Sequence, residues 1–182
     1  MEYDKIIEEL FNKRSNIHTI QIPSESGLYA IFLKENINFP INIERLDRLI
    51  YIGKSDNLQK RKFKQHSNTD STGSSTVRRL LGALLKYQLQ LTAIPRGSGK
   101  SEKDFQNYCF EHDGELRLTE WMNSYLEVSI CIVKKNIRDT EKSIISKLRP
   151  VLCLQDCQNN QKSNIKLLRK LCADEARSNA NR

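Results

Sequence analysis

Apolar residues recur along the chain with two kinds of spacing, and each kind predicts a different element. In residues 3–14 they fall on one helical face, which predicts an amphipathic helix (Ile6, Ile7, Leu10 and Phe11). Residues 28–33 (LYAIFL) and 49–52 (LIYI) are continuous apolar runs of strand length. Residues 126–133 (LEVSICIV) alternate as a strand does. We therefore expect a small antiparallel sheet, with the first two strands forming a wide hairpin.

Five further segments are predicted to be helical from their apolar spacing and their flanking cap residues. They are residues 57–66, 76–89, 116–125, 140–147 and 163–177. In the fourth, Asp139 or Thr140 is expected to cap the helix, which places Glu141 in its first turn. Polar, turn-rich stretches at 67–76 and 95–104 are expected to be loops. The order of elements predicts one α+β domain over residues 1–182, with about three antiparallel strands flanked by helices.

The charge of the chain points to a polyanionic partner. Its 30 lysines and arginines outnumber its 22 aspartates and glutamates, which gives a net charge of +8. Such an excess favours nucleic acid first and an anionic membrane second. No apolar run approaches the ~20 residues that a spanning helix needs, so we do not expect a membrane protein. A soluble protein that is merely basic stays open as the alternative.

The N-terminus and the cysteines bear on compartment and metal content. The first residues, MEYDKIIEELFNKR, lack the pattern of a secretory signal, so we expect a cytoplasmic protein with reduced thiols. Of the five cysteines only Cys153 and Cys157 lie close together. A zinc site usually needs a second close pair, so we do not expect one.

The most basic segment follows the second strand directly. The run LIYIGKSDNLQKRKFKQH, residues 49–66, turns at Gly53 and continues into a predicted helix rich in lysine, with Arg61 one turn after Asn57. A helix that begins beside a strand end and carries such side chains suits phosphate oxygens, and its first N–H groups add positive potential. A solvated basic face is the alternative.

Three segments, taken in order, resemble the GIY-YIG nuclease family: SGLYAIFL, then LIYIGKSDNLQKRKFKQH, then DTEKSIISKLRPVL. The first motif matches as Gly27, Leu28 and Tyr29, with leucine in place of the usual isoleucine, and the second is intact as Tyr51, Ile52 and Gly53. Two further stretches, GSSTVRRLLGALL and LTEWM, look like one bacterial branch of that family. The resemblance implies a nuclease core over residues 26–155, preceded by an N-terminal helix and lead-in at 1–25 and followed by a helical extension at 156–182.

The resemblance implies a role for each matching residue. Tyr29 would act as base, with Tyr51 orienting water or the phosphate. Arg61 would bind the scissile phosphate, for which its planar fork is suited. His66 would assist by hydrogen bonding or by shuttling a proton. Glu141 would bind Mg²⁺ or Mn²⁺, since a hard cation that keeps its waters can be held by one carboxylate.

The same residues have plainer interpretations. Tyr29 and Tyr51 could be ordinary strand tyrosines, Gly53 a turn glycine, and Glu141 a first-turn acid that stabilises its helix dipole. His66 follows Arg61 by five residues, where four is commoner in the family, and Gln65 occupies the fourth position. The connector 34–47 is longer than usual; it could touch DNA or decorate the hairpin edge. Many family members also carry an asparagine near the position of Cys153.

Further substrate contacts are expected outside these motifs. Lys54 and Lys62 flank the second motif and the basic helix. The Ser/Thr/Gly-rich turn before the helix at residue 76 could hold phosphate through hydroxyl and guanidinium groups; its candidates are Ser74, Ser75, Arg78 and Arg79. A capped helix with solvated arginines is the alternative for that turn.

The sequence thus predicts a divalent-metal-dependent endonuclease that hydrolyses phosphodiester bonds in DNA, with RNA open as a substrate. The rival is a non-catalytic nucleic-acid-binding module with the same fold, and a protein–protein adaptor is a third class. Metal-dependent turnover distinguishes the first two. A homodimer would suit an enzyme that cuts both strands, but no residues identify an interface.

Overall fold

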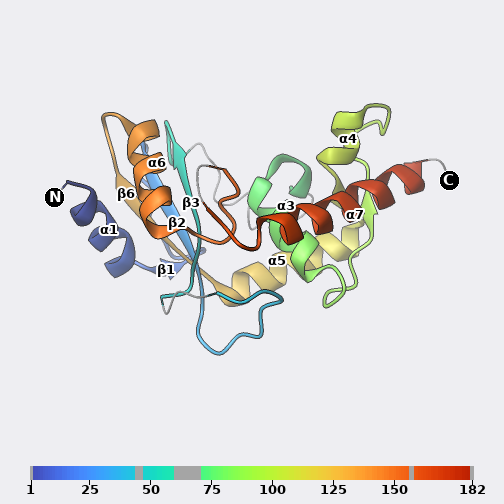
Figure 1. Ribbon diagram of the computed structural model, residues 1–182, viewed down its shortest axis with the longest axis horizontal. Helices are drawn as coiled ribbons and strands as arrows, with labels where there is room; N and C mark the ends of the chain where they lie inside the picture. The colour runs from blue at the N-terminus through green and yellow to red at the C-terminus, as the bar shows by residue number, and fades with distance from the viewer. Residues whose placement is uncertain (1, 44–46, 60–70, 156–157, 181–182) are drawn as a thin grey trace. The chain divides into compact units, whose positions relative to one another are not determined.

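The computed structural model describes residues 2–43, 47–59, 71–155 and 158–180, which fall into two compact units (Figure 1). The first unit comes from residues 1–64 and 125–160, and the second from residues 65–124 and 161–182. The division between a nuclease core at 26–155 and flanking segments follows other limits and stays a prediction. None of the helices in the described residues has the length and apolar character that crossing a bilayer requires.

The first unit is built on an antiparallel sheet with the strand order β1-β6-β2-β3. Its elements are α1 (Glu2–Asn12), β1 (Ser15–Asn16), β2 (Gly27–Leu33), β3 (Leu49–Ser55), β6 (Leu126–Ile132) and α6 (Ile137–Leu148). The three predicted strands and the predicted hairpin between β2 and β3 are confirmed, and the class is α+β. The fourth strand, β1, has only two residues, too few to give a periodic signal in the sequence.

Strand β2 is the centre of this sheet, because β3 and β6 pair with it on either side and all seven of its residues are buried. Alternate side chains point to opposite faces. Leu28, Ala30 and Phe32 join Leu10 of α1 and Ile144 of α6 in one apolar cluster. Helices α1 and α6 therefore lie side by side on this face, as Figure 1 also shows. Tyr29 occupies the other face.

Helix α6 begins earlier than the sequence predicts. Its N-cap is Asn136, in the left-handed backbone conformation, and neither Asp139 nor Thr140 caps it. Asp139 instead lies inside the first turn, and Thr140 is buried. The prediction of the cap, and of Glu141 in the first turn, was therefore wrong. Aspartate and threonine favour caps, but here the apolar stripe begins at Ile137 and sets the start of the helix.

The second unit is mainly helical. Its elements are η1 (Thr72–Ser74), α3 (Thr76–Leu85), β4 (Ala93–Ile94), α4 (Glu102–Gln106), β5 (Cys109–Phe110), most of α5 (His112–Tyr125) and α7 (Lys162–Ala180). Helix α7 packs along α3, β4 and α4 (Figure 1). The three predicted helices are present, and Ser75 caps α3 as expected. Helix α4 was predicted as loop, because its five residues offer no apolar period; a capping box at Ser101 starts it.

A buried ion pair holds α3 to α5. Nη2 of Arg78 lies 2.6 Å from a carboxylate oxygen of Glu115, and neither side chain has exposed surface. Thr72 donates to the same carboxylate at 2.8 Å and accepts from Nε of Arg78 at 3.1 Å. Thr119 accepts from Arg78, and the second Glu115 oxygen accepts from the backbone N–H of Phe110. These bonds satisfy the pair that burial would otherwise make costly.

We expect Arg78→Met to lower the free energy of unfolding by about 3–5 kcal/mol, because it leaves the Glu115 carboxylate buried without its counter-charge. Urea denaturation followed by circular dichroism measures this. Lys170→Met is the matched control, since it removes an ion pair of the same 2.6 Å length that lies in solvent. Equal shifts of the two midpoints would contradict the role given to the buried pair.

Candidate active site

The tyrosine of the first motif lies directly over the glycine of the second. Tyr29 of β2 is opposite Gly53 of β3 in the antiparallel register. A Cβ atom at Gly53 would lie 2.5 Å from both the phenol oxygen and Cζ of Tyr29. Real Cβ atoms do not approach so closely, so any other residue at position 53 would have to displace the ring. The two motifs are thus one packing unit, and the buried Tyr29 ring depends on the missing side chain.

Gly27, the glycine of the first motif, also lies where a side chain would not fit. A Cβ at Gly27 would overlap the carbonyl oxygen of Cys131 on β6 and would lie 2.7 Å from a methyl group of Leu58. Gly27 therefore lets strand β6 and the residues that follow β3 approach the start of β2 from two sides. Both motif glycines serve close approach of neighbouring groups, and neither is needed for a turn at a positive φ angle.

Tyr51, on the edge strand β3, contacts both Tyr29 and the apolar cluster on the other face of the sheet. Its ring centroid lies 6.0 Å from that of Tyr29, with the rings tilted by 34°. The same side chain also packs against the apolar cluster under α1 and α6. Tyr29 has no exposed surface, whereas Tyr51 is half-buried. Tyr51 is thus the tyrosine of the pair that also meets solvent.

Glu141 lies on the stripe of α6 that faces the sheet. It stands four residues after Ile137 and three before Ile144, which are partly buried and buried in the core cluster, and Glu141 itself is half-buried. Because the helix begins at Ile137, Glu141 lies in the second turn. The interaction of a carboxylate with the helix dipole falls off within the first turn. Dipole stabilisation therefore explains Glu141 less well than it explains Asp139.

Cys153 holds the outer edge of β3. Its Sγ accepts from the backbone N–H of Ile52 and donates to the carbonyl of the same residue, both at 3.4 Å. Next to it, the N–H of Leu152 donates to the carbonyl of Ile50 at 2.9 Å. The segment after α6 thereby fixes β3 on either side of Tyr51. The thiol makes these hydrogen bonds to β3 at a position where many members of the family that the sequence resembles carry asparagine.

The cations predicted around the tyrosines fall into two groups. Lys54 is opposite Leu28 in the register, so it starts from the face of the sheet covered by α6, together with Glu141 and opposite to Tyr29. Arg61, Lys62 and His66 lie outside the described residues. Their assignment to phosphate binding and proton transfer stays a prediction.

The residues predicted at the serine-rich turn make contacts of their own within the second unit. Ser75 caps α3 by accepting from the backbone N–H of Arg78, and Ser74 donates to the carbonyl of Ser71. The Arg78 guanidinium is enclosed by its ion pair, so solvated arginines do not describe this turn. Arg79 is buried as well and donates to backbone carbonyls. Their role as substrate contacts stays a prediction, which for Arg78 would require the ion pair to open.

The donor set suits a hard cation. Among the described residues, no three His, Cys, Asp or Glu side chains gather as a metal cluster. Structural zinc needs four such ligands, whereas Mg²⁺ is held through one or two carboxylates and keeps several waters. A half-buried carboxylate at Glu141, beside the edge strand that carries Tyr51, fits the second pattern.

Comparison with known proteins finds a family match. A family model described as GIY-YIG catalytic domain matches residues 17–174. The matched range contains both tyrosines, both motif glycines, Glu141 and Cys153. No curated protein and no solved structure matches the chain.

We expect Gly53→Ala to lower the free energy of unfolding by about 1–3 kcal/mol, because the added methyl overlaps the Tyr29 phenol. Urea denaturation gives the change. Repeating the substitution in a Tyr29→Leu background tests the cause, since a smaller side chain leaves room for the methyl. An equal cost in both backgrounds would show that Tyr29 is not what excludes the alanine.

Proposed function

The chain belongs to the GIY-YIG catalytic domain family, and from that membership we propose that it is a divalent-metal-dependent endonuclease that hydrolyses phosphodiester bonds in DNA. Members of this family are generally endonucleases that act on DNA with a divalent metal ion. The observation that carries the proposal is the fit of Tyr29 over Gly53 with Tyr51 at 6.0 Å, which joins the two family motifs into one site. The net charge of +8 supports a polyanionic substrate.

Hydrolysis requires four contributions. A water oxygen attacks phosphorus, its proton passes to a base, negative charge on the phosphoryl oxygens is stabilised, and the leaving oxygen takes up a proton. A divalent metal ion, when bound, supplies positive charge and orients its ligands. Glu141 would hold that ion, and the predicted phosphate ligand is Arg61, whose guanidinium stays charged at any working pH. His66 is predicted to assist by hydrogen bonding or by shuttling a proton.

The base comes from the tyrosine pair. A phenol has an ordinary pKa of about 10, so nearby cations must stabilise its anion. The sequence resemblance gave this role to Tyr29. The exposures favour Tyr51 as the group that takes the proton from water, because Tyr29 is enclosed and Tyr51 is half-buried at the sheet edge. In our proposal Tyr29 packs against the Tyr51 ring and fixes its orientation.

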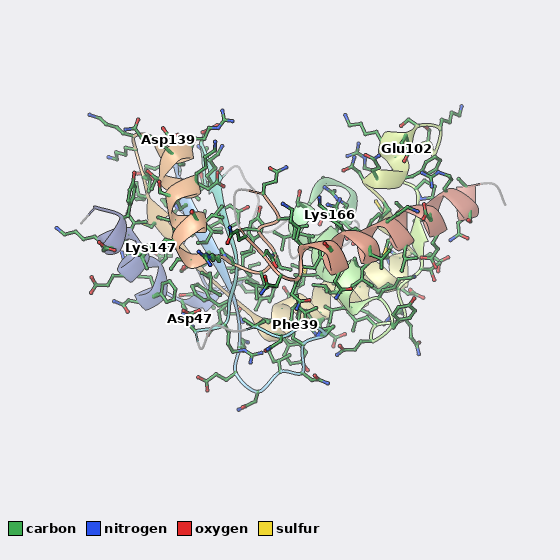
Figure 2. All side chains as sticks on the ribbon, in the orientation of Figure 1. Phe39, Asp47, Glu102, Asp139, Lys147 and Lys166 are labelled. Atoms are coloured by element: carbon green, nitrogen blue, oxygen red, sulfur yellow. The ribbon has the colours of Figure 1, made fainter. Side chains whose placement is uncertain are left out.

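We expect Glu141→Gln to reduce metal-dependent nicking of supercoiled plasmid by at least about 100-fold, since the loss of a metal ligand removes several kcal/mol of transition-state stabilisation. Asp139→Asn is the matched control: Asp139 is an exposed acid at the N-terminal end of the same helix (Figure 2). It should keep wild-type activity in Mg²⁺ or Mn²⁺, and EDTA should abolish cutting by both.

Other outcomes of that assay are also informative. Undiminished cutting by Glu141→Gln would remove Glu141 as a metal ligand. Equal loss in Asp139→Asn would mean that the charge of the helix end matters, not the position of one carboxylate. A wild-type protein that binds DNA in a salt-sensitive way but cuts neither duplex, branched nor single-stranded DNA would be a binding module with this fold.

Comparing Tyr51→Phe with Tyr29→Phe tests the assignment of the base. We expect the first to lower the cleavage rate by about 10²–10⁴-fold, the usual contribution of a positioned base, and to abolish the rise of the rate with pH. The second should lower the rate less and keep that pH dependence. Cleavage rates under single-turnover conditions over a range of pH measure both. The reverse ranking would return the base role to Tyr29.

A further inference from the structure

Two arginines of the second unit converge on one backbone carbonyl. Arg79, from the first turn of α3, donates through Nη1 to the carbonyl oxygens of Thr72 at 3.1 Å and Gly73 at 2.8 Å. Arg96, which follows β4, donates through its own Nη1 to the same Gly73 oxygen at 3.1 Å. Two guanidinium groups that share one acceptor must lie close together.

Gly73 makes this convergence possible. A Cβ atom there would lie 2.6 Å from Cδ of Arg96 and 2.7 Å from Sγ of Cys109. The glycine of the serine-rich turn therefore leaves space for the Arg96 side chain, and any larger residue would push it away from Arg79.

A third arginine comes from α7. Arg169 lies four residues after Ile165 and three before Cys172, on the buried stripe of α7, which packs against α3. Its Nε is buried, and no acceptor among the described residues hydrogen-bonds to it. The charge of Arg169 also acts on Arg79. Burial lowers the pKa of Arg79 to about 10, and the positive charges of Arg169 and Arg96 contribute to this decrease.

No carboxylate among the described residues hydrogen-bonds to any of the three. Glu115, the buried acid nearby, is committed to Arg78. Hydrogen bonding with Ser101 lowers the pKa of Asp104, and the charge of Arg96 contributes to this decrease. The hydrogen bonds of the Asp104 carboxylate, however, come from the backbone N–H groups of Lys100 and Ser101. Arg79 is only 7% exposed, and its buried Nε also has no acceptor in the part of the chain that the structure describes.

Arg78 and Arg79 differ in whether an acid neutralises them. Arg78 is buried with an acid, two threonine hydroxyls and a carbonyl around it. Arg79 is buried near two further cations, and among the described residues its hydrogen-bond partners are two carbonyls and one hydroxyl. A buried charge without a counter-charge is expensive, and like charges nearby add to the cost. An anion bound beside the three arginines would offset both costs.

We propose that Arg79, Arg96 and Arg169 form a binding site for a backbone phosphate of the nucleic acid, separate from the tyrosine pair of the first unit. Arg96 and Arg169 are half-buried and keep N–H groups that no described residue accepts, so they contact the phosphate. Arg79 is more deeply buried, supplies a fixed positive charge near them and donates to the Gly73 carbonyl. The phosphate is assigned to nucleic acid because the inference rests on the proposed nuclease function and on the net charge of +8.

Salt-dependent DNA binding tests this site without any cleavage step. Full-length Glu141→Gln protein in EDTA is titrated onto a fluorescent duplex at several salt concentrations. The variants Arg96→Gln and Arg169→Gln are each expected to raise the Kd about tenfold. Each should also make the negative slope of the logarithm of the association constant against log salt shallower by about 0.9, the value of one phosphate contact. Arg169→Lys, which keeps the charge, should restore most of the slope.

Lys166→Gln is the matched control, because it removes one positive charge from an exposed position on the same helix α7 (Figure 2). It should leave the slope unchanged. An equal loss in Lys166→Gln would show that only total charge matters, and unchanged binding in both arginine variants would show that the cluster takes no phosphate; either result overturns the proposal. Thermal denaturation by circular dichroism confirms that each variant is folded.

A free anion is distinguished by a second arm. If inorganic phosphate at constant ionic strength raises the melting temperature of the wild type but not of Arg169→Gln, while DNA binding is alike in both, the site takes a small anion only, and the nucleic-acid assignment is wrong. The proposed nuclease function fails separately. A wild type that never cuts, but whose DNA binding depends on Arg96 and Arg169, would retain this site and lose the catalytic proposal.

Discussion

The arrangement of the candidate site depends on one close contact, that of the Tyr29 ring with the backbone of Gly53. It works only in the register that places these two residues opposite each other. A slip of one residue would turn Tyr29 toward the face covered by α1 and α6 and would put a side chain under its ring. The contact thus fixes the pairing of β2 with β3, and with it the position of Tyr51 beside Tyr29.

Three other features of the first unit support the pairing of β2 with β3. Strand β2 is buried along its length, so the sheet cannot shift without exposing the apolar cluster. Helix α6 packs on β3 and β2, which sets Glu141 at the stripe facing them. The chain after α6 then returns along β3, where Cys153 bonds both backbone groups of Ile52. A thiol can fill this place because the requirement is one acceptor and one donor at short range, which does not demand an amide.

Sequence patterns predicted the parts of the fold that rest on local periodicity. The strands β2, β3 and β6 and the long helices have apolar patterns that survive in the structure. The start of α6 was missed because Asp139 has the chemistry of a cap, while the real cap, Asn136, is recognisable only from its backbone. Arg78 was predicted as a substrate contact, with a solvated arginine as the alternative. Its burial was missed because its partner, Glu115, lies 37 residues along the chain. Contacts over such distances leave no mark in local spacing, whereas the motif residues of the candidate site were found through resemblance.

The two buried arginines that follow each other in α3 show why burial has to be judged with its counter-charges. Arg78 and Arg79 are neighbours in sequence and similarly enclosed, yet the first is neutralised by Glu115 and the second faces Arg96 and Arg169. Packing alone would favour an apolar residue at Arg79, since replacing an imperfectly paired buried charge by an apolar side chain is often neutral or stabilising. The burial of this charge is best explained by a bound anion that offsets its cost in free energy. In a basic chain of a nuclease family, the ligand with matching charge is the phosphate of the substrate backbone. The second unit would then hold nucleic acid through its own arginines, while the tyrosines and Glu141 of the first unit would carry out the proposed cleavage.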